Sequence, residues 1–184
     1  MIDKLTGNEI LKKILGWAGY LGLIALILYF FAPPSWFQFG VTSADERQQV
    51  SEFSLSGFNG GGEWNFADKR GKVLLVNYWA TWCGPCRFET PGLVNIFQEF
   101  KDREFEIVGV TVDDNLEAVP PFIESYKIPY RILLPGNDPN LDGGGMKLPT
   151  TFLYDKQGRL AKKYTGMVLE MTFRSDIESL LAEE

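Results

Sequence analysis

The sequence of 184 residues contains no histidine and only two cysteines, and both shortages exclude kinds of active site. Without histidine there is no Ser-His-Asp or Cys-His catalysis, and no zinc, copper or haem iron bound by histidine. Two thiolates cannot supply all four ligands of a zinc or iron-sulfur site within one chain. The cysteine pair is therefore structural, catalytic or part of a shared site.

Basic residues are fewer than acidic ones, 18 against 24, which gives a formal net charge of -6. An acidic chain fits the polyanionic backbone of nucleic acids poorly, so we expect no nucleic-acid partner. The length suits one domain of ordinary size plus an additional segment. Such a domain can bury a hydrophobic core and does not need two cysteines as a staple.

Charge is missing from a long run near the N-terminus, residues 14–32, with the sequence ILGWAGYLGLIALILYFFA. As a helix with a rise of about 1.5 Å per residue, this run would span about 28 Å, close to the hydrocarbon thickness of a bilayer. We expect one transmembrane helix here. The alternative is a cleaved signal peptide, but the run exceeds the usual apolar region of about 7 to 15 residues and ends without a small-x-small cleavage site.

The charges around this run predict its orientation. Three lysines precede it, whereas the first charged residue after it is Asp45. Lysine is enriched on the cytoplasmic side of membrane helices, so residues 1–13 are expected in the cytoplasm. The chain would then be a single-pass protein of the cell membrane, with its remaining residues in the periplasm or another extracytoplasmic space.

A linker and one folded domain are expected after the anchor. Residues 33–50 begin with two prolines and continue into a polar stretch, which is typical of a tether. The folded domain is expected to cover residues 51–184.

The folded part alternates strand and helix patterns. Val73–Trp79 and Ile107–Val112 are apolar runs typical of strands buried on both faces. Between them, Pro85–Lys101 has apolar residues at helical spacing, and Pro91 predicts a kink. This order is a βαβ unit, and the fold class is α/β with a mixed central sheet flanked by helices. The other expected elements are a helix over Asn115–Tyr126, a strand over Arg131–Leu134, a hairpin of Thr150–Tyr154 and Arg159–Tyr164, and a helix over Leu169–Glu184.

The motif Trp82-Cys83-Gly84-Pro85-Cys86 lies where the first buried strand ends and the helix begins. Unpaired backbone N–H groups and positive potential at a helix start favour the thiolate of Cys83. Because the thiolate is the species that attacks disulfides, Cys83 is predicted to react first. Cys86, one turn later, is predicted to attack the mixed disulfide and release the product. Pro85 in the first turn costs no hydrogen bond.

Three other interpretations of the cysteine pair remain open. A structural disulfide across two intervening residues would stabilise the fold little, because it constrains the unfolded chain little. Soft thiolates could carry Cu(I), although the motif holds no further Met, His or Cys. The fold could also serve as a redox-inactive, anchored interaction domain.

Asp113-Asp114 at a strand end could indicate a metal site, but a solvated loop pair is the expectation, and no metal site is predicted.

The stretches NYWATWCGPCRFETP and LPTTFLYDKQGRL resemble membrane-anchored, extracytoplasmic thioredoxin-like proteins of the TlpA/ResA type. The resemblance covers roughly Ser51 to the C-terminus. It implies a thioredoxin-like fold and thiol-disulfide exchange, often the reduction of apocytochrome c cysteines before haem attachment. It implies no cofactor beyond a redox-active disulfide between Cys83 and Cys86.

The resemblance also implies roles for single residues. Cys83 matches the nucleophile and Cys86 the resolving thiol, while Pro149 matches a cis-proline that faces the cysteines and pairs its backbone with substrate. A cis bond between Leu148 and Pro149 is plausible on its own, because cis bonds are essentially confined to X-Pro. The substrate-binding surface is expected to include Trp82, Gly84, Pro85, Leu148 and Thr150. Trp79 could join this surface or the core.

Glu89 matches the acidic residue that the family carries near its active site. If it is buried, its pKa is raised and it could exchange a proton with Cys86; an exposed helix glutamate is the alternative. Ordinary thioredoxins carry a buried aspartate six residues before the first cysteine, where this chain has Asn77, which cannot transfer a proton. Glu89 would then act alone.

The Gly-Pro dipeptide resembles that of reducing thioredoxins, and a reductant outside the cytoplasm needs electrons from across the membrane. We therefore expect a monomeric disulfide reductase with protein disulfides as substrates and a membrane thiol transporter as electron donor. Dithiol oxidation and disulfide isomerisation remain open alternatives.

Overall fold

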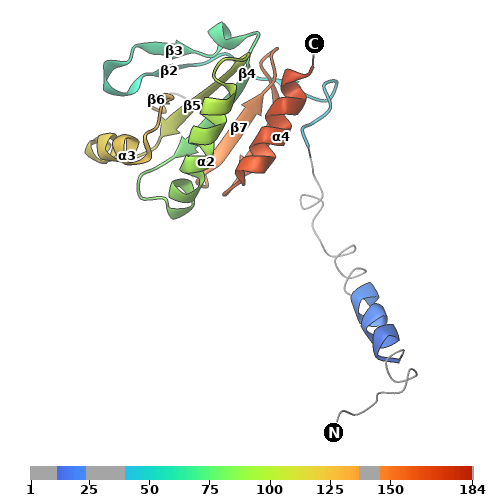
Figure 1. Cartoon of the computed structure of the whole chain (residues 1–184). Coiled ribbons are helices and arrows are strands. Elements are labelled where there is room, and N and C mark those ends of the chain that lie inside the picture. The colour runs from blue at the N-terminus through green and yellow to red at the C-terminus, as the bar shows by residue number, and fades with distance from the viewer. Residues whose placement is uncertain (1–11, 24–39, 137–145, 184) are drawn as a thin grey trace. The chain divides into compact units, whose positions relative to one another are not determined.

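The computed structural model describes residues 12–23, 40–136 and 146–183. Residues 12–23 are helical, whereas residues 24–32 of the expected membrane anchor lie outside the described residues. Within the described ranges, no helix combines the length and the apolar character that crossing a membrane requires. Gly40–Glu184 forms a compact unit of its own (Figure 1).

The centre of this unit is a six-stranded mixed sheet with the order β1-β8-β7-β4-β5-β6. β4, β5 and β6 run parallel to one another, while β7, β8 and β1 continue the sheet by antiparallel pairing. A mixed central sheet was predicted, and it is confirmed. Its strands are β1 (Gln48–Gln49), β4 (Val73–Trp79), β5 (Phe105–Thr111), β6 (Arg131–Leu133), β7 (Thr150–Tyr154) and β8 (Arg159–Thr165).

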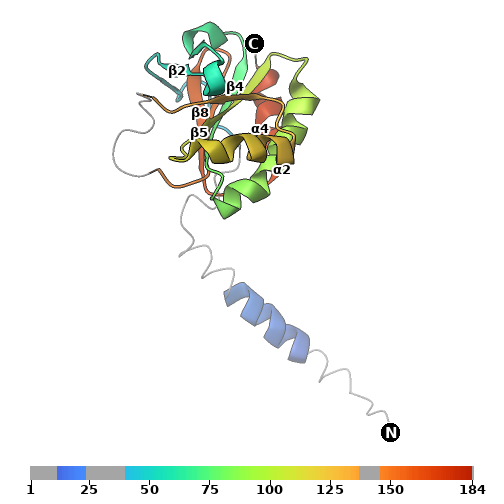
Figure 2. The same cartoon turned by 90° about the vertical axis from the view of Figure 1, so that its left-hand side faces the viewer.

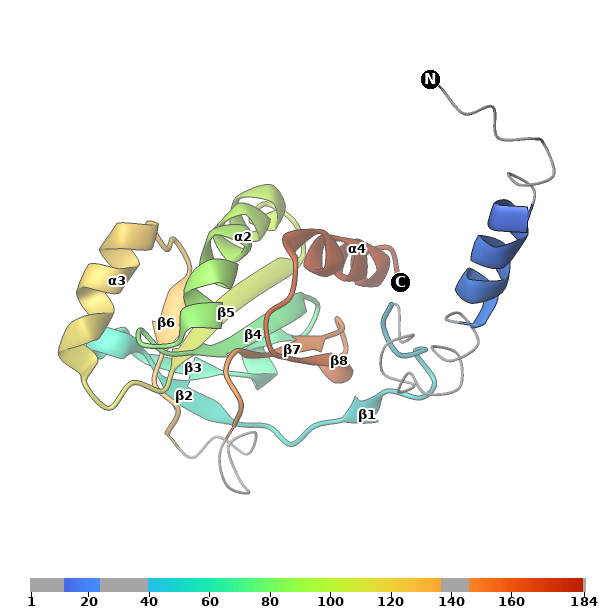
Figure 3. The same ribbon diagram turned by 90° about the horizontal axis from the view of Figure 1, so that it is seen from below.

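Three helices pack on one face of the sheet: α2 (Gly84–Phe100), α3 (Val119–Tyr126) and α4 (Glu170–Leu181). α2 and α4 lie side by side in Figures 1 and 3, and Figure 2 brings α3, drawn in gold, to the front. The buried apolar side chains of all three helices belong to one hydrophobic core with the facing strand residues. Pro91 lies inside α2, as predicted. α3 begins later than predicted, because Leu116–Ala118 forms a short 3-10 turn before the two prolines.

The opposite face of the sheet is covered by a small hairpin of β2 (Ser54–Ser56) and β3 (Glu63–Asn65) (Figure 3). The hairpin segment supplies four buried apolar side chains to a second core, namely Phe53, Leu55, Trp64 and Phe66. The sequence does not predict this hairpin, since each strand has only three residues. With a core on each face, all seven residues of β4 are buried, which accounts for its continuous apolar sequence.

The compact unit begins at Gly40, so the expectation that residues 33–50 form a linker is wrong for residues 40–50. The Thr42 backbone N–H donates to Ala161, and β1 pairs with β8. Residues 33–39 lie outside the described residues.

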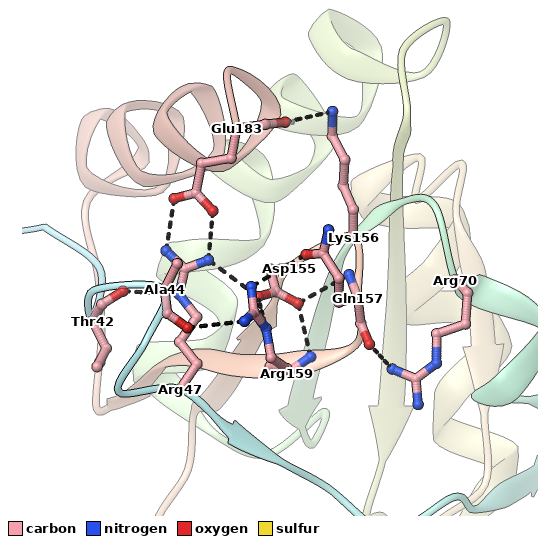
Figure 4. Close-up of polar contacts among 9 residues, drawn as sticks. All are labelled: Thr42, Ala44, Arg47, Arg70, Asp155, Lys156, Gln157, Arg159 and Glu183. Carbon is pink, nitrogen blue, oxygen red and sulfur yellow. Dashed lines mark hydrogen bonds and ion pairs between the residues drawn. The ribbon is translucent and has the colours of Figure 1, made fainter.

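Arg47 fixes this N-terminal arm through a cluster of charges, drawn in Figure 4. Its guanidinium is buried and lies 3.1 Å from Asp155 Oδ2 and 2.6 Å from Glu183 Oε2. Its Nε donates to the Thr42 carbonyl at 2.8 Å. Asp155 also accepts from Arg159 Nε and from two backbone N–H groups of the turn that joins β7 to β8. The arm therefore connects to both the sheet and the C-terminal end of the chain.

We expect Arg47→Ala to lower the free energy of unfolding of the full chain by about 2 kcal/mol. This is less than for an isolated buried pair, because Glu183 is partly exposed and Asp155 keeps Arg159. Denaturant unfolding measures the change, with Asp45→Ala, an exposed charge of the same arm, as the control. Equal stability of the two variants would contradict this role of Arg47.

Candidate active site

Cys83 and Cys86 are joined by a disulfide at the start of α2. α2 begins at Gly84, with Cys83 as its N-cap and Pro85 in the first turn, which is the predicted placement. The Cys86 backbone N–H donates to Cys83 Sγ at 3.2 Å. Both cysteines are buried, whereas Gly84 and Pro85 between them are exposed. The sulfur of Cys83 therefore already lies against a backbone N–H group at the positive end of the helix.

The Leu148-Pro149 peptide bond is cis, and this prediction is confirmed. Pro149 directly precedes β7, whose Thr150 pairs with Tyr78 near the end of β4. Because β4 leads to Cys83, the cis-proline lies at the same edge of the sheet as the disulfide. The Pro149 carbonyl accepts from the Gly166 backbone N–H at 2.8 Å.

The other predicted surface residues differ in exposure. Trp82 is 70% exposed and Leu148 is half-buried. Thr150, in contrast, is buried and donates to the Lys147 carbonyl, so its side chain supports the turn before β7 and lies behind the surface. Trp79 belongs to the core, where its ring stacks on Phe122.

Further exposed apolar side chains, which the sequence analysis does not single out, come from α2, from the segment between β8 and α4, and from the first turn of α4. They are Phe88, Met167, Leu169 and Met171. The segment between β8 and α4 is hydrogen-bonded to Pro149 through Gly166 and to Glu89 through Val168. The apolar residues of MVLEM, which runs into the start of the C-terminal helix, were the available signal.

Glu89 is 4% exposed, and its carboxylate is held from two sides. Oε1 accepts from Asn77 Nδ2 at 3.1 Å, and Oε2 accepts from the Val168 backbone N–H at 2.9 Å. Burial raises the pKa of Glu89 to about 7, although these two hydrogen bonds act in the opposite direction. The buried position was one of two alternatives from the sequence. Asn77 cannot exchange a proton, but it orients Glu89 and also donates to Thr151.

Tyr130 is a second titratable group of this interior. Burial, and then the negative charge of Glu89, raise its pKa above the usual range of a tyrosine. It therefore stays neutral, and Glu89 is the group here whose charge changes near neutral pH.

Asp113 and Asp114 behave differently from each other. Asp114 is exposed, but Asp113 is buried and accepts hydrogen bonds from Thr81, so the expectation of a solvated pair is wrong for Asp113. Among the residues that the structure describes, no three Cys, Asp or Glu side chains are grouped so that they could hold a metal ion.

The raised pKa of Glu89 makes stability depend on pH. Because about 7 in the folded state exceeds the ordinary value of 4.5, the folded state binds this proton more tightly than the unfolded state. The free energy of unfolding should therefore fall by up to about 3 kcal/mol as pH rises from about 4.5 to above 7. Glu89→Gln is expected to lack this decrease, apart from a constant offset.

Denaturant unfolding of the oxidised protein across this pH range measures the effect, with the exposed Glu124→Gln as control. The same slope in Glu89→Gln and in the unaltered chain would refute the assignment.

Residues 47–175 match the AhpC/TSA family. The chain is 35% identical over 132 residues to the thiol-disulfide oxidoreductase ResA of Bacillus subtilis, an alignment that covers 71% of this chain and 73% of that protein. It is 39% identical over 119 residues to the thiol:disulfide interchange protein HelX of Rhodobacter capsulatus, covering 63% of this chain and 65% of that one.

Solved structures agree with this assignment. A thiol:disulfide interchange protein of the thioredoxin family from Chlorobium tepidum has a TM-score of 0.67 at 26% identity and covers 77% of this chain and 100% of its own. A DsbF homologue from Corynebacterium diphtheriae has a TM-score of 0.68 at 28% identity, covering 76% of this chain and 91% of its own. The chain therefore belongs to the AhpC/TSA family, has a thioredoxin-like fold and is a thiol-disulfide oxidoreductase of the TlpA/ResA-like group.

Proposed function

We propose that the protein reduces disulfides of extracytoplasmic proteins, apocytochrome c among them, through the dithiol form of Cys83 and Cys86. The observation that carries this proposal is the disulfide at the N-terminus of α2, with a cis-proline at the same edge of the sheet. Exposed apolar side chains occur on α2 and in the segment after β8. HelX and ResA, by name a thiol:disulfide interchange protein and a thiol-disulfide oxidoreductase, support the reaction class.

The reaction begins with reduced cysteines. The Cys83 thiolate attacks one sulfur of the substrate disulfide, forms a mixed disulfide and releases a substrate thiolate, which takes up a proton. The Cys86 thiolate then attacks Cys83 Sγ, closes the Cys83–Cys86 bond and releases the second substrate thiolate. Two electrons pass from the protein to the substrate.

Helix geometry prepares Cys83 for the first step. Cys83 is the N-cap of α2, and its sulfur accepts a hydrogen bond from the Cys86 backbone N–H. The N-terminal end of the helix also supplies positive potential. Both interactions stabilise a thiolate more than a thiol, which lowers the pKa of Cys83 and raises its reactive fraction.

Glu89 serves the second step by accepting the proton of Cys86. Cys86 and Glu89 both lie on the buried face of α2, three residues apart. A carboxylate with a pKa of about 7 is suited to exchange protons near neutral pH.

The substrate chain binds beside the disulfide. Pro149 has no N–H and its carbonyl accepts from Gly166, so we expect the backbone of the preceding residue, Leu148, to pair with the substrate. Trp82, Phe88 and Met167 would contact apolar substrate side chains next to the reacting cysteine.

Electrons are supplied by a membrane thiol transporter, and residues 14–32 anchor the chain with residues 1–13 in the cytoplasm. The uncharged run and the preceding lysines support this arrangement.

Purified full-length protein is expected to reduce a protein disulfide such as that of insulin with dithiothreitol as electron source, and Cys83→Ser to abolish turnover. Cys86→Ala should instead accumulate mixed disulfides with substrates in cells, because the resolving thiol is missing. Mass spectrometry of the trapped complexes identifies the substrates. Tight Cu(I) binding without any disulfide turnover would replace this proposal with the copper carrier.

Glu89→Gln is expected to slow release of substrate from a preformed mixed disulfide by about 10- to 100-fold above pH 7, with a smaller effect below pH 6. The loss grows with pH because Glu89 accepts a proton only when ionised. A release rate with the unaltered pH profile would exclude Glu89 as the proton acceptor.

A further inference from the structure

The three residues between β4 and Cys83 decide where the reactive sulfur lies. The Val112 backbone N–H donates to the Trp79 carbonyl at the end of β4, and the Cys83 N–H donates to the Ala80 carbonyl. Thr81 lies between these two hydrogen bonds. Its backbone N–H donates to a residue outside the loop.

Asp113 is the group that holds Thr81. Its Oδ2 accepts from the Thr81 backbone N–H at 2.9 Å and from Thr111 Oγ1 at 2.7 Å, and its Oδ1 accepts from Thr81 Oγ1 at 2.6 Å. Asp113 is 8% exposed. Three donors therefore converge on one buried carboxylate.

Strand register explains why these residues meet. Trp79 and Thr111 are paired in the parallel strands β4 and β5. Thr81 and Asp113 each follow their paired residue by two positions, so both leave the same edge of the sheet together. The carboxylate is itself fixed on the end of β5, because the Asp113 N–H donates to Thr111 Oγ1 at 3.3 Å.

Charged side chains approach the loop from α2 and from the end of β5. Arg87 from α2 reaches the Thr81 carbonyl from the other side, at 3.5 Å. Asp113 comes from the end of β5, and Asp114 beside it is exposed. Trp82, the next residue after Thr81, points outward and is 70% exposed. The hydrogen bonds from Thr81 to the buried Asp113 thus hold the loop in place.

We propose that Asp113 is a positioning residue for Cys83: by holding Thr81 it keeps the Cys83 sulfur at the N-cap of α2 and so sustains its reactivity. The inference rests on the proposed function, in which Cys83 is the attacking thiol. Asp113 acts through the loop and does not touch the reacting sulfurs.

Two effects of Asp113 on Cys83 would have opposite signs. A nearby negative charge by itself raises the pKa of a thiol, so its removal lowers that pKa. Loss of position removes the helix N–H groups from the thiolate, which raises the pKa instead. Asn at this position removes the charge but can keep the geometry, because the Thr81 hydroxyl can accept from the Asn amide.

The test is the pH dependence of iodoacetamide alkylation of Cys83, in full-length protein that carries Cys86→Ala throughout. The variants are Asp113→Ala, Asp113→Asn, Thr81→Val and Thr81→Ser, with Asp114→Ala as the control for charge. Asp113→Ala and Thr81→Val are expected to raise the pKa of Cys83, with a reaction rate at neutral pH about threefold to tenfold lower. Asp113→Asn removes the charge and keeps the contact, so the pKa of Cys83 should stay at or below that of the parent. Thr81→Ser and Asp114→Ala should react like their parent.

A folded Asp113→Ala whose Cys83 pKa is unchanged or lowered would overturn the proposal, with circular dichroism as the check of folding. If Asp113→Ala does not fold, the Thr81→Val and Thr81→Ser pair decides, because Thr81 is half-buried and Ser restores the hydroxyl. Alkylation requires no protein substrate. A lack of insulin reduction by the unaltered protein would therefore reject the proposed function alone, while the alkylation shift would still report on Asp113.

Discussion

Burial of β4 on both faces is the constraint on which the rest of the structure depends. One core, shared with the three helices, covers one face, and the core of the β2–β3 hairpin covers the other. A strand packed in this way has little freedom to shift, so the position of the chain that follows it is fixed. That position is the start of α2, where Cys83 caps the helix. The reactivity of one sulfur thus depends on two hydrophobic cores.

Two buried carboxylates bracket the cysteine pair, and their surroundings give them different tasks. Glu89 has two hydrogen-bond donors in a mostly apolar interior, so burial dominates and its pKa rises to about 7. Asp113 has three donors at the end of β5 and holds the approach to Cys83. Glu89 is suited to accept the proton of Cys86. Asp113 is suited to hold the loop that precedes Cys83 in the sequence. Buried charges cost free energy unless they are hydrogen-bonded, and both are.

The parts of the fold that follow local rules could be predicted from the sequence. The continuous apolar run of β4 indicates a doubly buried strand, and the X-Pro rule permits the cis bond before Pro149. Glu89 was singled out by the resemblance to the TlpA/ResA type, and the structure decides between its buried and exposed alternatives. The remaining features depend on partners far away in the sequence. Arg47 lies in a mostly polar stretch, and its partner Asp155 is 108 residues distant. The sequence around Asp113 predicts a solvated residue, whereas the register of β4 and β5 places it next to Thr81. No local pattern carries such information.

The central proposal is that the protein reduces disulfides, and the reduction potential of the Cys83–Cys86 couple tests it most directly. Equilibration of the full-length protein with glutathione or dithiothreitol buffers, followed by thiol alkylation, gives this potential. A reductase of this design should have a potential near that of thioredoxin, about -270 mV. A value close to that of a strong dithiol oxidant, about -120 mV, would contradict the proposed reductase function.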